Sequence, residues 1–363
     1  MIEIIPASLY NTIYLLIVLT FSFFIFNKYI IYEKGLDLDS FKRSNIVFLA
    51  VLMIFFIGLR PDSGVFVDMM NTIVDYRTFY EGRPFKLRTD TDNLIYDNFL
   101  AWTGSLCLGT PFFFTAIASI YFGAAYWGIR RLFPLHTAIV YLAFLGAFST
   151  FSYATNGVKA GAAASMFILA VSYYRHWKIC LPLLAVCYGF HHSMQLPIVA
   201  FLFACYWKNT KHFFAGWLFC LLCAAAHVTF FQELFAGMTD DQGAGYLNSV
   251  GQDWSGKSGF RIDFVIYSFM PVLVGYHAIF KQQIQSPLYE TILKTYLLTN
   301  GVWMLCMYAA FTNRIAYLSW SLYPILLLYP FLNEEWGERQ YPIAAKVFMA
   351  HLGFTLFMSI IYY

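Results

Sequence analysis

The chain carries ten long runs of mostly apolar residues, and these runs constrain its fold more than any other feature. A helix needs about 20 such residues to cross the hydrocarbon core of a membrane. Because 60% of the 363 residues are hydrophobic and only 12% are charged, too few polar side chains remain to cover a water-soluble protein of this size. We therefore predict an all-α, polytopic integral membrane protein. The predicted crossings lie near residues 8–31, 44–60, 111–129, 134–153, 158–174, 213–231, 262–280, 290–311, 315–331 and 342–362.

Two further apolar stretches do not fit a simple crossing. Residues 93–108 form a short stretch that includes Asp97, and residues 179–206 are interrupted by His191, His192 and Pro197. We predict that both are re-entrant or interfacial helical elements. Irregular backbone at membrane depth is tolerated only where protein or a water-filled cavity satisfies its hydrogen bonds. The two elements therefore predict a cavity that opens outward.

The distribution of basic residues sets the predicted orientation. Cytoplasmic loops carry an excess of Lys and Arg, and the linker after the first apolar run holds Lys28, Lys34, Lys42 and Arg43. A cytoplasmic linker leaves the N-terminus outside. We predict one polytopic membrane domain, residues 1–363, whose two long outer loops span residues 60–92 and 232–260.

The sequence lacks the motifs of several other protein classes. Basic residues are scattered among apolar runs, which argues against a nucleic-acid partner. No phosphate-binding glycine motif occurs in a strand-to-helix setting, so no nucleotide cofactor is expected. The seven cysteines lie in or beside apolar stretches without His or carboxylate at metal-ligand spacing, so no metal site is expected. No internal repeat is evident, which disfavours a transporter.

Four cations stand at helix ends that the predicted topology puts on the outer side. They are Arg60, Lys159, Arg261 and Arg314. At the centre of a membrane helix each cation would cost about 2.5 to 3.5 kcal/mol, and less near the interface, so each needs compensation.

One interpretation is that each cation reaches the membrane boundary or pairs with a nearby acid. Arg314, however, has no acidic residue between Glu290 and Glu334. Outer loops are also on average poor in Lys and Arg. We therefore predict that the four cations bind an anion from outside, since the Arg fork suits the paired oxygens of a phosphate.

Other polar residues in the outer half are candidates for the rest of the site. For His191 and His192, a hydrogen-bonded structural role and acid-base catalysis both remain open. Asp62 and Asp68 in the first outer loop could accept a proton, although a solvated loop would look similar. Trp254 in the glycine-rich second loop suits a lid that stacks on a sugar, and a loop without function fits equally well.

Small residues recur between residues 157 and 165 at near-helical spacing. Such a face predicts close packing between helices in lipid. A tightly held helix start would also fix the direction in which Lys159 projects.

Four short segments resemble the motifs of one known family. They are Gly58-Leu59-Arg60 followed by Gly64 and Asp68, Asn156-Gly157-Val158-Lys159 before an alanine-rich helix, Phe190-His191-His192-Ser193, and Asn313-Arg314-Ile315. In this order they span most of the chain, and the sequence resembles the EpsG-like, Wzy-type polymerases of bacterial exopolysaccharide, capsule and O-antigen. One departure is Lys159-Ala160, where the family usually has Arg-Gln.

The resemblance implies a multi-pass enzyme of the bacterial inner membrane whose active site faces the periplasm. Such an enzyme joins oligosaccharide repeat units carried on undecaprenyl pyrophosphate, and both donor and acceptor are lipid-linked in this way. Glycosyl transfer releases undecaprenyl pyrophosphate and requires no metal or soluble cofactor. Membrane lipid, a chain-length regulator and a flippase are the further partners that the resemblance implies.

On this interpretation the polar residues divide into three roles. Arg60, Lys159, Arg261 and Arg314 stabilise the departing pyrophosphate. His191 and Asp68 compete as the general base. The remaining predicted substrate-binding residues are Asn156, Asp62, His192 and Trp254.

Two alternatives remain open. A lipid-linked oligosaccharide flippase, or another polysaccharide exporter, would also need cations in a cavity. A glycosyltransferase that uses polyprenyl-phosphate sugars would share the outer carboxylates.

Overall fold

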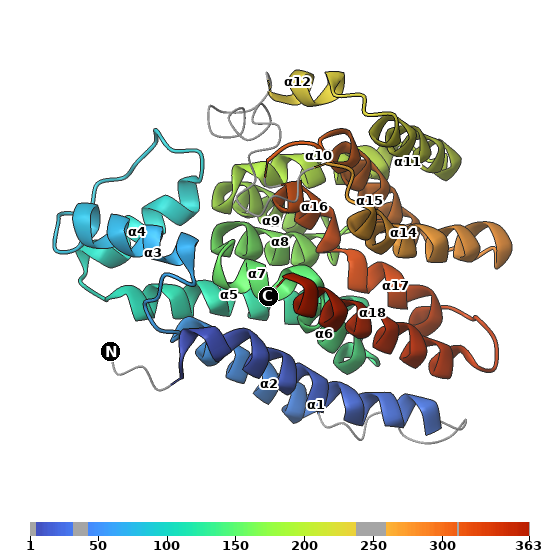
Figure 1. The fold of residues 1–363 in the computed structure, drawn as a ribbon, viewed down its shortest axis with the longest axis horizontal. Helices are drawn as coiled ribbons and strands as arrows, with labels where there is room; N and C mark the ends of the chain where they lie inside the picture. The colour runs from blue at the N-terminus through green and yellow to red at the C-terminus, as the bar shows by residue number, and fades with distance from the viewer. Residues whose placement is uncertain (1–4, 32–42, 237–258, 311, 363) are drawn as a thin grey trace. The chain divides into compact units, whose positions relative to one another are not determined.

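The computed structural model describes residues 5–31, 43–236, 259–310 and 312–362. The chain divides into two compact units, Met1–Gln195 with Phe331–Tyr363 and Leu196–Pro330, and each unit is described by itself. Every regular element in the described ranges is a helix, and these ranges contain no strand (Figure 1). The all-α prediction is confirmed, whereas a single domain over residues 1–363 stays a prediction.

Five helical segments in the described part of the chain are long and apolar enough to cross a membrane. They are Ala7–Ile31, Thr110–Leu132, Ile262–Lys281, Thr312–Asn333 and Gln340–Ile360. The bent pair Thr137–Leu145 and Phe148–Thr155 gives a sixth if it counts as one span. These helices support a membrane protein, but the number of ten crossings is not confirmed. For example, the 16 residues of α2 (Arg43–Gly58) extend only about 24 Å, less than the hydrocarbon core of about 30 Å.

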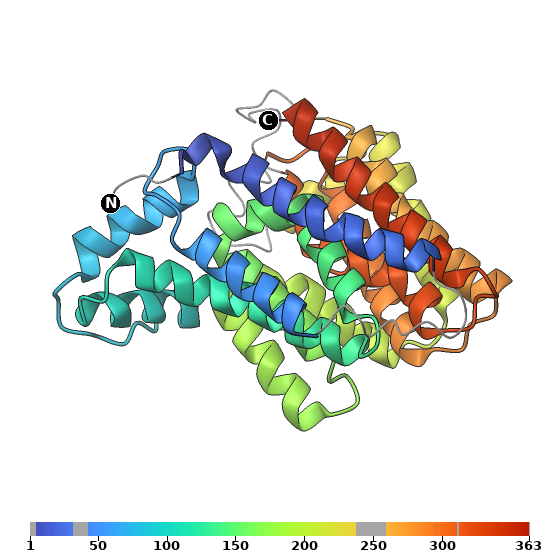
Figure 2. The same ribbon diagram turned by 90° about the horizontal axis from the view of Figure 1, so that it is seen from below.

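In the first unit, α5 (Thr110–Leu132) packs closely against both α2 and α8 (Val158–Val171) (Figure 2). Glycines permit both approaches. A Cβ on Gly58 of α2 would lie 2.6 Å from the Cα of Thr115, and a Cβ on Gly128 of α5 would lie 3.0 Å from the backbone nitrogen of Leu169. Small residues are the usual means by which helix backbones approach in lipid. The contact at Gly58 fixes where the chain leaves α2, and therefore where Arg60 lies.

A broken helix lies beside α1 (Tyr10–Ile31) and α18 (Gln340–Tyr362), which run side by side (Figures 1 and 2). Its halves, α6 (Thr137–Leu145) and α7 (Phe148–Thr155), meet at a bend of 66°. Side chains satisfy the carbonyls at the break. The Tyr14 hydroxyl donates to Leu145 (2.7 Å), His351 Nε2 to Ala143 (3.0 Å), and the Thr355 hydroxyl to Gly146 (2.7 Å). Protein thus satisfies the backbone at the break, which is the condition for an interrupted helix within a membrane.

The two irregular stretches form short helices. Residues 93–108 contain α4 (Leu94–Ser105), and residues 179–206 contain α9 (Trp177–Phe190), the 3₁₀ turn η4 (His192–Met194) and α10 (Gln195–Tyr206). At about 18 to 21 Å, none of these α-helices can cross the membrane alone. Their lengths are compatible with the predicted re-entrant or interfacial elements.

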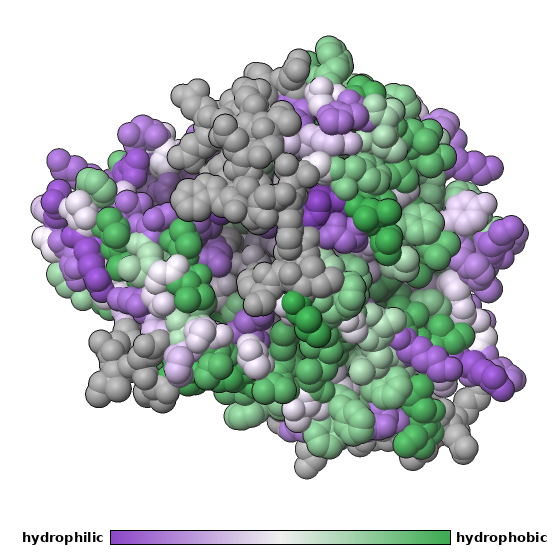
Figure 3. Space-filling model, viewed as in Figure 1, coloured by the Kyte–Doolittle hydropathy of each residue, from purple (hydrophilic) through white to green (hydrophobic). Residues whose placement is uncertain are grey.

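The segment before α4 folds back onto it. α3 (Val67–Asp75) continues into a π-helical turn, η3 (Tyr76–Tyr80), which packs on α4. Figure 3 shows hydrophilic side chains gathered over α3 and α4, and mostly hydrophobic ones over α1. This contrast fits a lipid-facing α1 and a more polar environment for α3 and α4.

The second unit contains most of α10 and of α17 (Tyr323–Asn333), and five further α-helices among its described residues. These are α11 (Thr210–Ala225), α12 (Phe230–Ala236), α14 (Ile262–Tyr276) with the π-helical end η5 (His277–Lys281), α15 (Pro287–Leu305) and α16 (Thr312–Trp320). A buried polar network links four of these five helices.

This network centres on Asn300 of α15. Its amide oxygen accepts from Trp217 Nε1 (2.9 Å), and its amide nitrogen donates to the hydroxyls of Ser268 and Ser319 (3.1 Å each). A fully satisfied buried network of this kind fixes the register of the helices that contribute to it.

We expect Gly58→Ala to destabilise the first unit, because its Cβ would overlap the backbone of α5 rather than a movable side chain. Overpacking of this kind typically costs about 1–3 kcal/mol. Thermal unfolding in detergent micelles should show a lower midpoint. Gly123→Ala, on the open side of α5, is the matched control because nothing lies within 4 Å of its Cβ position. Equal midpoints for the two variants would refute close packing at Gly58.

Candidate functional site

Arg60 lies just beyond the end of α2 and is only 2% exposed. Its Nη1 donates to the carbonyl of Ile57 (2.7 Å), and its Nη2 donates to the carbonyl of Thr155 at the end of α7 (2.9 Å). No residue that the structure describes forms an ion pair with Arg60. The compensation that a buried cation requires therefore comes from main-chain carbonyls of two helices.

The surroundings of Arg60 favour its charged form. The C-terminal ends of helices carry partial negative charge, and Arg60 faces two of them. Its guanidinium carbon also lies 5.4 Å from the ring centroid of Phe66 and 5.0 Å from that of Phe114, within the range of cation–π attraction. The guanidinium consequently remains positive at neutral pH.

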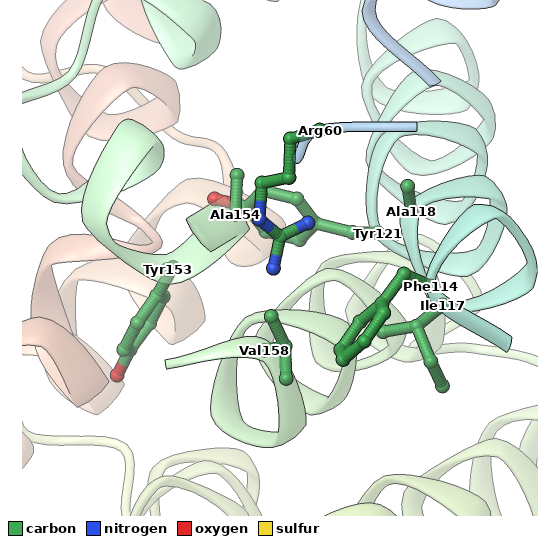
Figure 4. A pocket seen from close by; sticks show the side chains of 8 residues that line it. All are labelled: Arg60, Phe114, Ile117, Ala118, Tyr121, Tyr153, Ala154 and Val158. Carbon is green, nitrogen blue, oxygen red and sulfur yellow. The ribbon is translucent and has the colours of Figure 1, made fainter. Parts of the chain in front are cut away.

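Arg60 points into a recess between α5, α7 and the start of α8 (Figure 4). The recess is narrow, with a volume of about 10 Å³, and suits a water-sized group rather than a sugar. Nε of Arg60 is buried there without a hydrogen-bond partner among the described residues. The larger outward cavity predicted from the sequence is not confirmed. The other lining residues are Phe114, Ile117, Ala118, Tyr121, Tyr153, Ala154 and Val158.

Lys159, in the first turn of α8, is more accessible than Arg60. Its Nζ lies 3.6 Å from Oδ1 of Asp97 on α4, and the two side chains are 38% and 16% exposed. The other carboxylate oxygen of Asp97 accepts a hydrogen bond from the hydroxyl of Thr91. The ammonium also lies 4.9 Å from the ring centroid of Tyr96. α4 therefore supplies both a counter-ion and an aromatic face to Lys159.

Tyr96 connects the surroundings of the two cations. It is fully buried and packs edge-on against Phe113 of α5, with ring centroids 5.4 Å apart. The next residue in the sequence is Phe114, whose ring contacts Arg60. Tyr96 also interacts electrostatically with Arg60 and Asp68. One buried tyrosine thus lies between a buried guanidinium and an accessible ammonium.

Close packing positions the start of α8. A Cβ on Gly161 would lie 2.8 Å from the carbonyl oxygen of Tyr153, and a Cβ on Gly157 would lie 2.8 Å from the Tyr153 ring. The close packing predicted for the small residues between 157 and 165 is confirmed at these two glycines. Asn156 precedes this turn, and its buried side-chain oxygen has no hydrogen-bond partner among the described residues.

His191 caps the 3₁₀ turn η4. Its Nδ1 accepts from the backbone N–H of Ser193 (3.2 Å) and lies 2.7 Å from the Ser193 hydroxyl. A backbone N–H can only donate, so neutral His191 carries its proton on Nε2. The backbone N–H of His192 donates to the side-chain oxygen of Asn93 (3.3 Å), which ties η4 to the start of α4. Both histidines consequently lie near the element that carries Asp97.

The two predicted carboxylates differ in their surroundings. Asp62 forms an ion pair with Arg77 (2.9 Å), whose side chain is 56% exposed. Asp68 lies in the first turn of α3 and is partly buried. Only Asp68 has an electrostatic link to Tyr96.

The remaining predicted cations belong to the second unit. Arg261 forms a bidentate ion pair with Asp263 (Nε–Oδ1 3.0 Å and Nη2–Oδ2 2.7 Å). Its guanidinium carbon lies 3.7 Å from the ring centroid of Phe264. Arg314 is exposed on α16. Trp254 lies outside the described residues. The structure therefore brings Arg60 and Lys159 into one unit, and Arg261 and Arg314 into the other.

The sequence interpretation missed Asp97, Tyr96 and Thr91. An isolated acid within a short apolar stretch was the signal for Asp97, since a carboxylate there requires a partner. The apolar residues around Tyr96 gave no comparable signal. Among the described residues, no three His, Cys, Asp or Glu side chains come together in a way that could hold a metal ion.

The model of the EpsG family matches residues 43–363. This range includes all four segments that carry the resemblance. No curated protein and no solved structure matches the chain.

We expect Arg60→Met to lower stability strongly, because it removes the side-chain donors to Ile57 and Thr155. A buried acceptor left unsatisfied costs about 1–3 kcal/mol. Arg77→Met is the control, since an exposed ion pair contributes at most about 1 kcal/mol. Unfolding midpoints in micelles would compare the two. If Arg60→Met proves as stable as Arg77→Met, then Arg60 does not hold α2 and α7 together.

Proposed function

The chain belongs to the EpsG family, and from this membership we propose that it polymerises oligosaccharide repeat units carried on undecaprenyl pyrophosphate. The family is associated with glycosyltransferase-like polysaccharide polymerases. Several apolar helices support a membrane protein, and we propose the periplasmic face of the bacterial inner membrane as the place of reaction.

In the proposed reaction, a sugar hydroxyl of the incoming lipid-linked unit attacks the anomeric carbon that joins the growing chain to its carrier. A new glycosidic C–O bond forms as the bond to the pyrophosphate breaks. The hydroxyl proton passes to a general base, and undecaprenyl pyrophosphate leaves with its negative charge. The site must therefore supply a base and positive charge for the leaving group.

Lys159 is the observation that carries the proposal. Its ammonium is more accessible than the guanidinium of Arg60, it stands at the start of an apolar helix, and α4 holds it beside Tyr96. We propose that Lys159 contacts the pyrophosphate directly. Arg60 would act at a distance. Its buried charge raises the positive potential at Lys159 without touching a large substrate.

For the general base, the hydrogen bonds favour Asp68 over His191. The Nδ1 lone pair of neutral His191 already accepts from the backbone of Ser193, so proton uptake there would break the cap of η4. Asp68 lies on α3 within electrostatic range of Tyr96. Asn156, with its unsatisfied oxygen, and His192 are proposed to bind the substrate, as are Asp62, Arg261, Arg314 and Trp254.

We expect Lys159→Met to slow polymerisation by about 100-fold, because removing one preorganised charge from a leaving-group site typically costs this much. The assay gives purified protein defined undecaprenyl-pyrophosphate repeat units and measures the ladder of lengthened products. Lys178→Met is the matched control, since Lys178 is exposed on α9 and lies on the predicted cytoplasmic side. Thermal unfolding of both variants would establish that they are folded.

Two outcomes of this assay would contradict the proposal. Equal rates for Lys159→Met and Lys178→Met would remove Lys159 from the site. Wild-type protein that moves the lipid across vesicles but never lengthens the glycan would be a flippase, not a polymerase.

The assignment of the base has its own test. We expect Asp68→Asn to abolish the acidic limb of the pH–rate profile, because the group that must lose a proton is then absent. His191→Asn should leave that limb in place and change mainly stability. The reverse result would identify His191 as the base, and full activity in both variants would eliminate both residues.

A further inference from the structure

The pairing of Lys159 with Asp97 has a consequence for which anions the site admits. Lys159 stands in the first turn of an apolar helix, and the topology predicted from the sequence places it on the outer side, where we expect lipid headgroups. Anionic phospholipids attract cations at the membrane surface. A lone ammonium at this place would therefore be occupied by whichever phospholipid lies nearest.

Asp97 is held in place as a counter-ion. One carboxylate oxygen accepts from Thr91, and the other lies 3.6 Å from the ammonium of Lys159. The carboxylate stands in the first turn of α4, where the helix dipole favours negative charge. At 16% exposure it is much less accessible than the side chain of Lys159, which is 38% exposed. Lys159 can therefore move to a ligand while Asp97 stays fixed.

The separation of the pair leaves room for exchange. At 3.6 Å the ammonium is attracted to the carboxylate without a short hydrogen bond. A phosphodiester headgroup offers one negative charge, the same as Asp97, so it gains little by replacing Asp97. A pyrophosphate offers at least two charges and more acceptor oxygens, so it can attract Lys159 more strongly than the carboxylate does.

We propose that Asp97 is a specificity-determining residue, which excludes monoanionic phospholipid headgroups from Lys159 and leaves it available to a pyrophosphate lipid. This inference rests on the proposed function for the identity of the substrate. Asp97 acts through Lys159, and Thr91 fixes Asp97.

The test measures binding of farnesyl pyrophosphate, a short polyprenyl pyrophosphate, to full-length protein in lipid nanodiscs. One set contains phosphatidylcholine alone, and the other contains phosphatidylcholine with phosphatidylglycerol, whose phosphodiester is monoanionic. In Asp97→Asn, phosphatidylglycerol should raise the apparent Kd for farnesyl pyrophosphate, and this rise should be about fivefold larger than in wild type. A factor of this size is the effect of one modest charge interaction. Asp90→Asn is the matched control, because it removes an exposed carboxylate that pairs with Arg88 in the same segment (3.7 Å).

Further variants separate this role from a merely structural one. Asp97→Glu should restore the wild-type response to phosphatidylglycerol. Thr91→Val should show a smaller effect in the same direction. In the double variant Asp97→Asn with Lys159→Met, the added sensitivity to phosphatidylglycerol should vanish, because the cation that phospholipid would occupy is gone.

The inference is wrong if Asp97→Asn and Asp90→Asn respond equally to phosphatidylglycerol, or if the double variant keeps the sensitivity. If Asp97→Asn does not fold, the responses of Thr91→Val and Asp90→Asn to phosphatidylglycerol are compared instead, and equal responses contradict the inference. Failure of the proposed function would look different. In that case farnesyl pyrophosphate binds with the expected lipid dependence, but lipid-linked repeat units are never lengthened.

Discussion

The two hydrogen bonds from Arg60 to the carbonyls of Ile57 and Thr155 are the contact on which the first unit depends. They join the end of α2 to the end of α7, and α7 leads directly into the turn that carries Lys159. Because both acceptors are helix ends, one positive charge meets two partial negative charges without a carboxylate. The arrangement keeps a guanidinium charged while it is almost completely buried.

Arg60 and Lys159 consequently have different physical roles. Arg60 uses its planar fork to bridge two backbones, which a lysine ammonium could not do with the same geometry. Lys159 is a point charge on a flexible stem, and Asp97 holds it where a ligand can still reach it. The first unit thus combines a buried, backbone-bound guanidinium with a partly exposed ammonium beside a carboxylate.

Two interruptions of regular structure among the described residues of the unit are likewise satisfied by protein. Carbonyls at the break between α6 and α7 accept from Tyr14, His351 and Thr355. The backbone of η4 is tied to α4 through Asn93. Satisfied irregular backbone allows polar residues such as His191 to stand between apolar helices, where a continuous helix could not present them.

The sequence by itself predicted the helical class, which the structure confirms, and a membrane setting, which several apolar helices support, because a helix in an apolar run satisfies its own backbone hydrogen bonds. It also identified Arg60 and Lys159 as cations that need partners, since unpaired charge is costly in lipid. Only tertiary structure decided what those partners are. Carbonyls on helices distant in sequence and a carboxylate on α4 leave no periodic pattern, because their contacts arise from how helices pack.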